Sequence, residues 1–156
     1  MVSNRSDENS VVEISSRLRL AIARMARRMR QHSGTDLSAA LTSALATVER
    51  HGPLTPSELA DAERVARPSA TRILTRLLEQ GLVNRTPDPA DRRSSLVAIT
   101  PAGRSLLNRL RTRKNAYLAR QLRELDPADV EVLERAAGVL ERMLETEERR
   151  APKRHG

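Results

Sequence analysis

Apolar residues recur every three or four positions over most of this chain, which is the pattern of amphipathic helices. The first such stretch covers about residues 11–31, and Ser10 with Glu13 forms a capping-box pattern at its start. The apolar positions of this helix are Ile14, Leu18, Ile22, Met25 and Met29. Further helices are predicted over about residues 38–50, 56–62, 68–80, 100–123 and 126–148.

Two short segments, residues 82–85 and 95–99, are instead predicted to be β-strands. The connection between them is rich in proline and charge, with Pro87, Asp88 and Asp91. A short helix with a capping-box pattern of Thr55 and Glu58, a turn, a longer helix and then a hairpin follow one another in this region. This order predicts a mainly α fold with a small β-hairpin wing, that is, a winged helix-turn-helix.

The helix predicted over residues 68–80 carries candidate binding residues on one of its two faces. Ala70, Ile73, Leu74 and Leu77 share one face and should contact the core. The other face carries the candidate DNA-binding residues Ser69, Arg72, Thr75 and Arg76, with Thr71 at its margin. Arginine can bond guanine in a bidentate way, and hydroxyls can contact bases or phosphates. On an isolated helix these residues would merely be solvated, but the preceding short capped helix favours DNA binding.

The hairpin supplies a second group of candidate DNA-binding residues. These are Arg85, Asp91, Arg92 and Arg93. A charged arm on a hairpin can reach phosphates or a narrow minor groove. Asp91 cannot itself attract DNA, so we expect it to orient a neighbouring arginine, Arg93, by ion pairing.

Composition narrows the function further. The 156 residues carry a net charge of +8, which favours a polyanionic partner such as double-stranded DNA. The chain has no cysteine, which excludes disulfides and thiol redox sensing, and its three histidines are scattered. We therefore expect no enzyme activity, no metal and no cofactor. No apolar run approaches a membrane span and no signal peptide is evident, so a cytoplasmic protein without a membrane partner is expected.

Three segments together resemble a known family. They are ELA at 58–60, ATRILTRLLEQGLVNR at 70–85 and DPADRRSSLVAITPAG at 88–103. The last contains an Asp-x-Arg pair, Asp91 and Arg93, followed by Ile99, Thr100 and Gly103. This combination closely resembles the MarR family of winged-helix regulators, named for multiple antibiotic resistance. One departure is Ala66, where many members have a serine or a similar helix cap.

The resemblance implies an obligate homodimer whose terminal helices interlock. The residues expected at that interface are Ile14, Leu18, Ile22, Val130, Leu133 and Leu140. The expected division is a disordered N-terminus at 1–9, helical dimerisation regions at 10–36 and 101–148, a DNA-binding domain at 37–100 and a disordered basic tail at 149–156.

The expected function is that of a sequence-specific transcriptional regulator, a repressor that binds a pseudo-palindromic operator. The resemblance also implies release by a small-molecule effector in a crevice between the dimer arms and the winged domain. The alternative is a winged-helix protein-interaction module that does not bind DNA.

Overall fold

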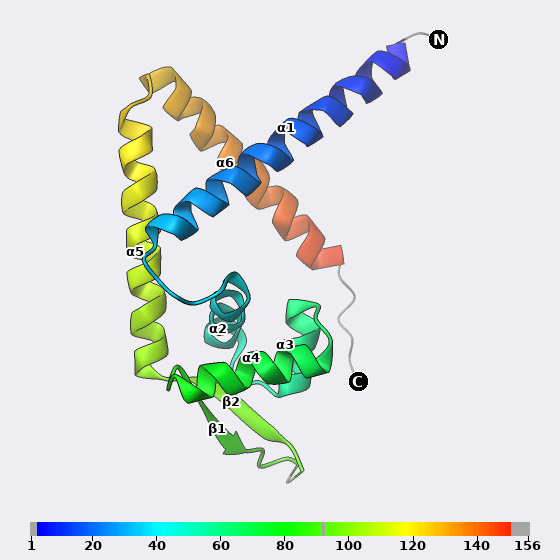
Figure 1. Ribbon diagram of the computed structural model, residues 1–156. Coiled ribbons are helices and arrows are strands. Elements are labelled where there is room, and N and C mark those ends of the chain that lie inside the picture. Colours follow the sequence, from blue (N-terminus) through cyan, green and yellow to red (C-terminus); the bar gives the residue numbers. More distant parts are fainter. Residues whose placement is uncertain (1–2, 92, 151–156) are drawn as a thin grey trace. The chain divides into compact units, whose positions relative to one another are not determined.

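The computed structural model describes residues 3–91 and 93–150 (Figure 1). Its elements in chain order are α1 (Ser3–His32), α2 (Ala39–His51), α3 (Pro56–Glu63), α4 (Arg67–Glu79), β1 (Val83–Pro87), β2 (Ser95–Ile99), α5 (Pro101–Arg123) and α6 (Pro127–Arg150). The predicted mainly α fold with a hairpin wing is confirmed. The chain divides into two compact units, residues 1–115 and 116–156.

The core of the first unit lies where α2, α3 and α4 meet the hairpin. Leu45, Leu59, Leu77 and Val97 are completely buried there. Burial of each such side chain stabilises the fold by about 1.5–3 kcal/mol. This core contains only aliphatic residues, in a chain whose sequence has one tyrosine and no phenylalanine or tryptophan.

The hairpin is attached to the helices by a backbone bridge that the sequence did not predict. β1 and β2 are antiparallel, with Val83 opposite Ile99 and Pro87 opposite Ser95. On the other edge of β2, Leu54 exchanges two backbone hydrogen bonds with Val97, of 3.1 and 2.8 Å. The linker between α2 and α3 therefore holds the base of the wing against the core.

Two predicted element boundaries differ from the structure. The first strand begins at Val83 rather than residue 82 and includes Pro87, which was expected in the connection. Proline is tolerated at the end of an edge strand because few ladder bonds need its missing N–H. α1 begins at Ser3, so residues 3–9 are helical rather than disordered as expected. No proline or glycine interrupts this stretch, and the Ser10–Glu13 pattern is simply part of the helix surface.

The remaining helix limits agree with the predictions within about two residues. At the start of α2, the Ser38 hydroxyl caps the helix by accepting the Leu41 N–H at 3.3 Å. The capping box of Thr55 and Glu58 at the start of α3 is also present. α6 continues to Arg150, and the rest of the expected basic tail lies outside the described residues. Within the described ranges, no helix has both the length and the apolar character that a membrane crossing requires.

Candidate nucleic-acid interface

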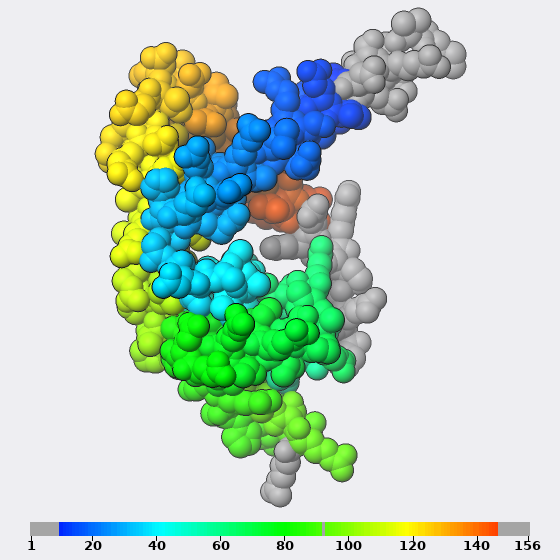
Figure 2. Space-filling model, in the orientation of Figure 1, coloured from blue at the N-terminus to red at the C-terminus, as the bar shows by residue number. Residues whose placement is uncertain are grey.

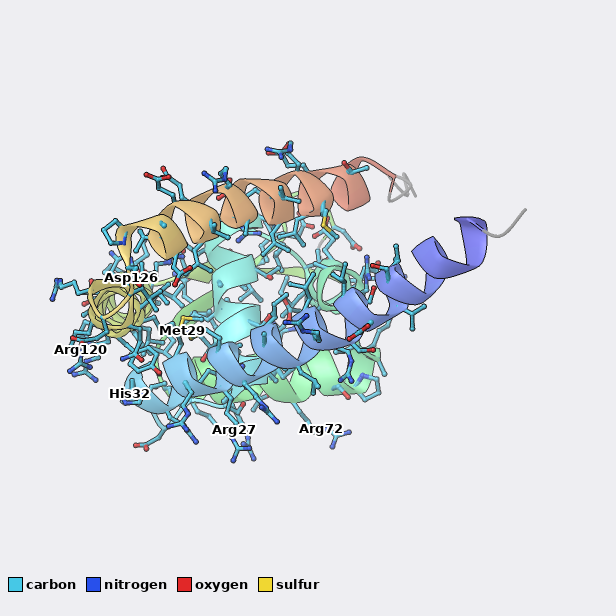
Figure 3. All side chains as sticks on the ribbon, turned by 90° about the horizontal axis from the view of Figure 1, so that it is seen from above. Arg27, Met29, His32, Arg72, Arg120 and Asp126 are labelled. Carbon is cyan, nitrogen blue, oxygen red and sulfur yellow. The ribbon has the colours of Figure 1, made fainter. Side chains whose placement is uncertain are left out.

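The packing of α4 fixes which of its faces is available to a ligand. Ala70, Leu74 and Leu77 are buried against the core. The opposite side leaves four candidate residues exposed, namely Thr71, Arg72, Thr75 and Arg76. Figure 3 shows the Arg72 side chain directed away from the rest of the molecule, and in Figure 2 the green surface of α4 is open to solvent. The exposed face is thus the one expected from the sequence.

Two residues of this helix differ in burial from what the sequence predicted. Ser69 was predicted on the exposed face and is half-buried, and Ile73 was predicted to contact the core and is also half-buried. Both lie at the border between the two faces. Ser69 as a whole residue is therefore less exposed than Thr71 or Thr75.

The hydroxyl groups of α4 are held by the helix itself. Thr71 Oγ1 donates to the Arg67 carbonyl at 3.0 Å, and Thr75 Oγ1 donates to the Thr71 carbonyl at 2.9 Å. Their oxygen atoms still have lone pairs that can accept a hydrogen bond. Arg72 makes one long contact, from Nε to the Pro68 carbonyl at 3.5 Å. Its remaining N–H groups are available for a planar acceptor pair such as a base edge.

The start of α4 has no side-chain cap. Ala66 is the N-cap residue, and no side-chain hydrogen bond closes this end of the helix. The departure from the family pattern at this position therefore has a structural consequence. The first turn of α4 relies on backbone geometry and on Pro68, which favours the first turn of a helix.

Residues from α4 and the hairpin meet at the base of the wing. Thr71, Thr75 and Arg85 all line a small cavity of about 40 Å³ between α4 and β1. Arg85 is exposed, and its Nε donates a hydrogen bond of 2.5 Å to Ser95 Oγ on the neighbouring strand. The structure thus brings together three of the predicted site residues. Ser95 was not predicted, because only the strand register places it beside Arg85.

The tip of the wing is braced by two aspartates. Asp88 accepts the N–H of Ala90, and Asp91 accepts the N–H of Arg93, both at 2.9 Å. These are turn-type bonds from a side chain to its own local backbone. Among the described residues no ion pair joins the side chains of Asp91 and Arg93. The expected ion pair is therefore wrong in this structure, since Asp91 holds the Arg93 backbone instead. The predicted Arg92 lies outside the described residues.

The predicted dimerisation residues divide between the two units. On α1, Ile14, Leu18 and Ile22 are exposed to 50%, 45% and 50%. On α6, Leu133 is exposed, whereas Val130 and Leu140 are half-buried. Four of these six side chains, Ile14, Leu18, Ile22 and Leu133, thus leave about half of their surface open, far more than a core residue does.

α6 also carries a second apolar row that sequence reasoning missed. Val132, Ala136, Val139 and Met143 follow one another at helical spacing beside the predicted row, and Val132, Val139 and Met143 are 52%, 47% and 59% exposed. The same spacing rule that found the first row could have found this one.

A larger cavity of about 620 Å³ lies within the first unit, between the end of α1, the start of α2 and α5. Its lining includes the apolar residues Met29, Leu37 and Leu110 and the cations Arg30 and Lys114. Figure 3 shows Met29 on the α1 side of this region. In the described part of the chain, no group of three or more His, Cys, Asp or Glu residues could hold a metal ion.

Known proteins resemble this chain in both sequence and structure. The family model described as "MarR family" matches residues 37–95. An uncharacterised HTH-type transcriptional regulator of Mycobacterium bovis is 34% identical over 133 residues, which are 85% of this chain and 93% of that protein. The HTH-type transcriptional repressor NicR of Pseudomonas putida is 33% identical over 106 residues, which are 67% of this chain and 64% of the repressor.

A solved structure supports the same relationship. The crystal structure of a putative transcriptional regulator from Pseudomonas aeruginosa superposes with a TM-score of 0.80 and 28% identity, over 87% of this chain and 96% of that one. The combined sequence and structural similarity confirms that this is a regulator rather than an enzyme, as predicted. The chain belongs to the MarR family of winged helix-turn-helix transcriptional regulators.

Proposed function

We propose that this protein is a dimeric, cytoplasmic repressor that binds a pseudo-palindromic operator through α4 and the hairpin. The observation that carries the proposal is the orientation of α4, whose buried face leaves Arg72 and Arg76 exposed beside the wing. The name of the Pseudomonas putida relative, a transcriptional repressor, favours repression over activation. In this proposal residues 37–100 form the DNA-binding domain, and residues 10–36 and 101–148 form the dimerisation regions.

Within each subunit, α4 enters the major groove and the wing contacts the flanking backbone or minor groove. Arg72 and Arg76 read base edges, and Ser69, Thr71 and Thr75 contact bases or phosphates. Arg85, Arg92 and Arg93 neutralise phosphates, and Asp91 keeps the Arg93 backbone in position. This division separates residues that specify sequence from residues that supply affinity.

The dimer is supported by the exposed apolar rows of the terminal helices. Apolar area of this extent on a small protein usually marks an interaction site. α6 carries two adjacent rows, and a helix with two apolar sides needs two neighbours to bury them. A homodimer in which terminal helices of both subunits interlock would supply those neighbours. Sedimentation that finds a stable, folded monomer at micromolar concentration would contradict the dimer.

The experiment that tests the DNA-binding proposal is selection of bound sequences from random DNA, followed by footprinting. A two-fold dimer should select an inverted repeat with half-sites roughly 10 base pairs apart, because its two α4 helices must enter successive major grooves. Affinity should fall steeply with salt. The slope of the logarithm of the binding constant against the logarithm of the salt concentration should be about −0.9 for each neutralised phosphate. A chain that binds no DNA at low salt would instead act as a protein-interaction module.

We further propose that the 620 Å³ cavity is the effector site. Its wall combines apolar side chains with Arg30 and Lys114, and none of its lining residues is acidic. These features suit an amphipathic anion, in which a carboxylate meets the cations and an apolar body fills the rest. A thermal-shift screen of small carboxylic acids against the wild type and Lys114→Gln tests this, since binding should depend on Lys114.

A further inference from the structure

Two helices of this chain end with the same hydrogen-bonding motif but with different residues. After α4, Gly81 adopts a left-handed conformation with φ of 67°. The Gly81 N–H donates to the Leu78 carbonyl, and the Leu82 N–H donates to the Leu77 carbonyl, both at 2.9 Å. This pair of bonds is the Schellman motif, in which glycine is the usual residue because it has no Cβ.

The end of α3 repeats this motif without glycine. Arg64 occupies the left-handed position with φ of 53° and ψ of 41°. Its N–H donates to the Asp61 carbonyl at 3.2 Å, and the Val65 N–H donates to the Ala60 carbonyl at 3.0 Å. Over residues 3–91 and 93–150, Arg64 is the only non-glycine residue with a positive φ. An arginine in this conformation is strained, because its Cβ approaches the following carbonyl oxygen.

The fold itself does not use the Arg64 side chain. The side chain is exposed, and no hydrogen bond or ion pair among the described residues involves its guanidinium. The carboxylate of the adjacent Glu63 accepts a 2.5 Å hydrogen bond from the Thr47 hydroxyl of α2. Within the described part of the subunit, the two backbone bonds of the motif are thus the hydrogen bonds that offset this strain, and the Arg64 side chain adds none.

The position of Arg64 suggests what its side chain does. It lies in the turn between α3 and α4, three residues before Arg67, the first residue of α4. When a helix-turn-helix docks, its first helix crosses the DNA backbone and its second helix enters the major groove. The turn between them is thus brought close to the sugar-phosphate backbone.

We propose that Arg64 is a phosphate-binding residue of the DNA interface. Its cationic side chain in the turn contacts the backbone of the operator outside the contacts of α4 and the wing. This inference rests on the proposed function and adds a residue to it. It also explains why a long cationic side chain occupies a backbone conformation that glycine would adopt without strain.

The test compares Arg64→Gly, Arg64→Asn and Arg64→Lys in the full-length chain. Arg64→Gly removes both the charge and the strain, so it should raise Tm, by about 2 °C for a protein of this size. Arg64→Asn is also neutral and tolerates the left-handed conformation. Both variants should bind the selected operator more weakly, with a salt slope lower by about one for each subunit. Arg64→Lys should keep the wild-type slope.

Two controls make the outcome decisive. Arg135→Gln removes an exposed arginine from α6, outside the winged domain, and should leave the slope unchanged. Arg72→Ala reports on the α4 contacts in the same assay. If Arg72→Ala is impaired and Arg64→Gly binds like wild type, or if Arg64→Gly melts no higher than wild type, the role of Arg64 is overturned and the proposed function stands. If the wild type binds no DNA, both are overturned.

Discussion

The hydroxyl of Thr100 donates a 2.7 Å hydrogen bond to the carbonyl oxygen of Gly81 and so joins the start of α5 to the end of α4. The hydroxyl oxygen of Thr100 also accepts the N–H of Gly103, at 3.1 Å, in the first turn of α5. The backbone N–H of Thr100 also donates to the Leu82 carbonyl at 3.0 Å. This one residue therefore fixes where α5 leaves the wing and where α4 ends.

Replacement of Thr100 by valine should destabilise the protein. Thr100→Val keeps the shape of the side chain but loses both hydroxyl bonds, which should lower the free energy of unfolding by about 1–3 kcal/mol. Thr100→Ser keeps the oxygen and should lose much less. Urea denaturation of the two variants measures the difference. Equal stability of Thr100→Val and wild type would show that these bonds do not hold the junction.

Gly103 should not tolerate a side chain. A Cβ at this position would lie 2.2 Å from the Leu82 carbonyl oxygen and 2.8 Å from Ile99 Cγ1. Because a backbone atom cannot move aside easily, Gly103→Ala should cost about 1–3 kcal/mol by overpacking. Gly138→Ala on α6 is the matched control, since its nearest neighbour is the flexible Arg142 at 3.5 Å. The control should be neutral or gain up to about 1 kcal/mol from helix propensity.

The ion pair between Glu49 of α2 and Arg111 of α5 should contribute little to stability. The hydrogen bond to Glu49, aided by its charge, raises the pKa of the Arg111 guanidinium above its ordinary value. A raised pKa contributes stability that is fully present below the ordinary arginine pKa and is lost only as the pH rises through the raised value. This contribution to the free energy of unfolding is therefore constant around neutral pH. The Arg111 side chain is 52% exposed, and solvent screens the pair. Glu49→Gln should therefore cost less than about 1 kcal/mol, and the difference from wild type should shrink in about 1 M NaCl. If Glu49→Gln lowered the free energy of unfolding by several kcal/mol, the pair would not be a weak, solvent-screened surface pair.

Arg72 and Arg93 should have different effects on DNA binding. Arg72→Ala removes a proposed base contact and should relax the preference at one position of each half-site, at about 1–3 kcal/mol. Arg93→Ala removes a proposed phosphate contact and should weaken binding to all sequences alike. Binding to a panel of single-base operator variants, measured at several salt concentrations, separates the two effects. Identical profiles for both variants would contradict the division between base and phosphate contacts.

Much of the fold could be predicted from periodicity because the helices bury one face. The spacing of Ala70, Leu74 and Leu77 identified the buried side of α4, and the exposed side followed from it. Capping residues located helix starts for a similarly local reason. The Thr55 capping box needs only residues three positions apart, and the structure forms it as predicted. Local signals of this kind are independent of the rest of the chain.

Some features depended on contacts between distant segments, which periodicity does not report. The pairing of Leu54 with Val97 joins backbone atoms 43 positions apart in the chain. The expected ion pair of Asp91 with Arg93 was wrong for a different, local reason. The sequence shows which charges are neighbours but not which atoms meet, and Asp91 accepts the backbone N–H of Arg93 instead.

The helices of this protein and the exposed cationic face of α4 could be predicted from the sequence alone, because both follow from the spacing of apolar side chains along single helices. How the elements join could be seen only in the folded chain. The packing of the Leu82 carbonyl against Gly103 leaves no room for a Cβ, and the end of α3 places Arg64 in a left-handed conformation. Neither follows from local composition, because backbone geometry at a junction is set by the segments on both sides of it.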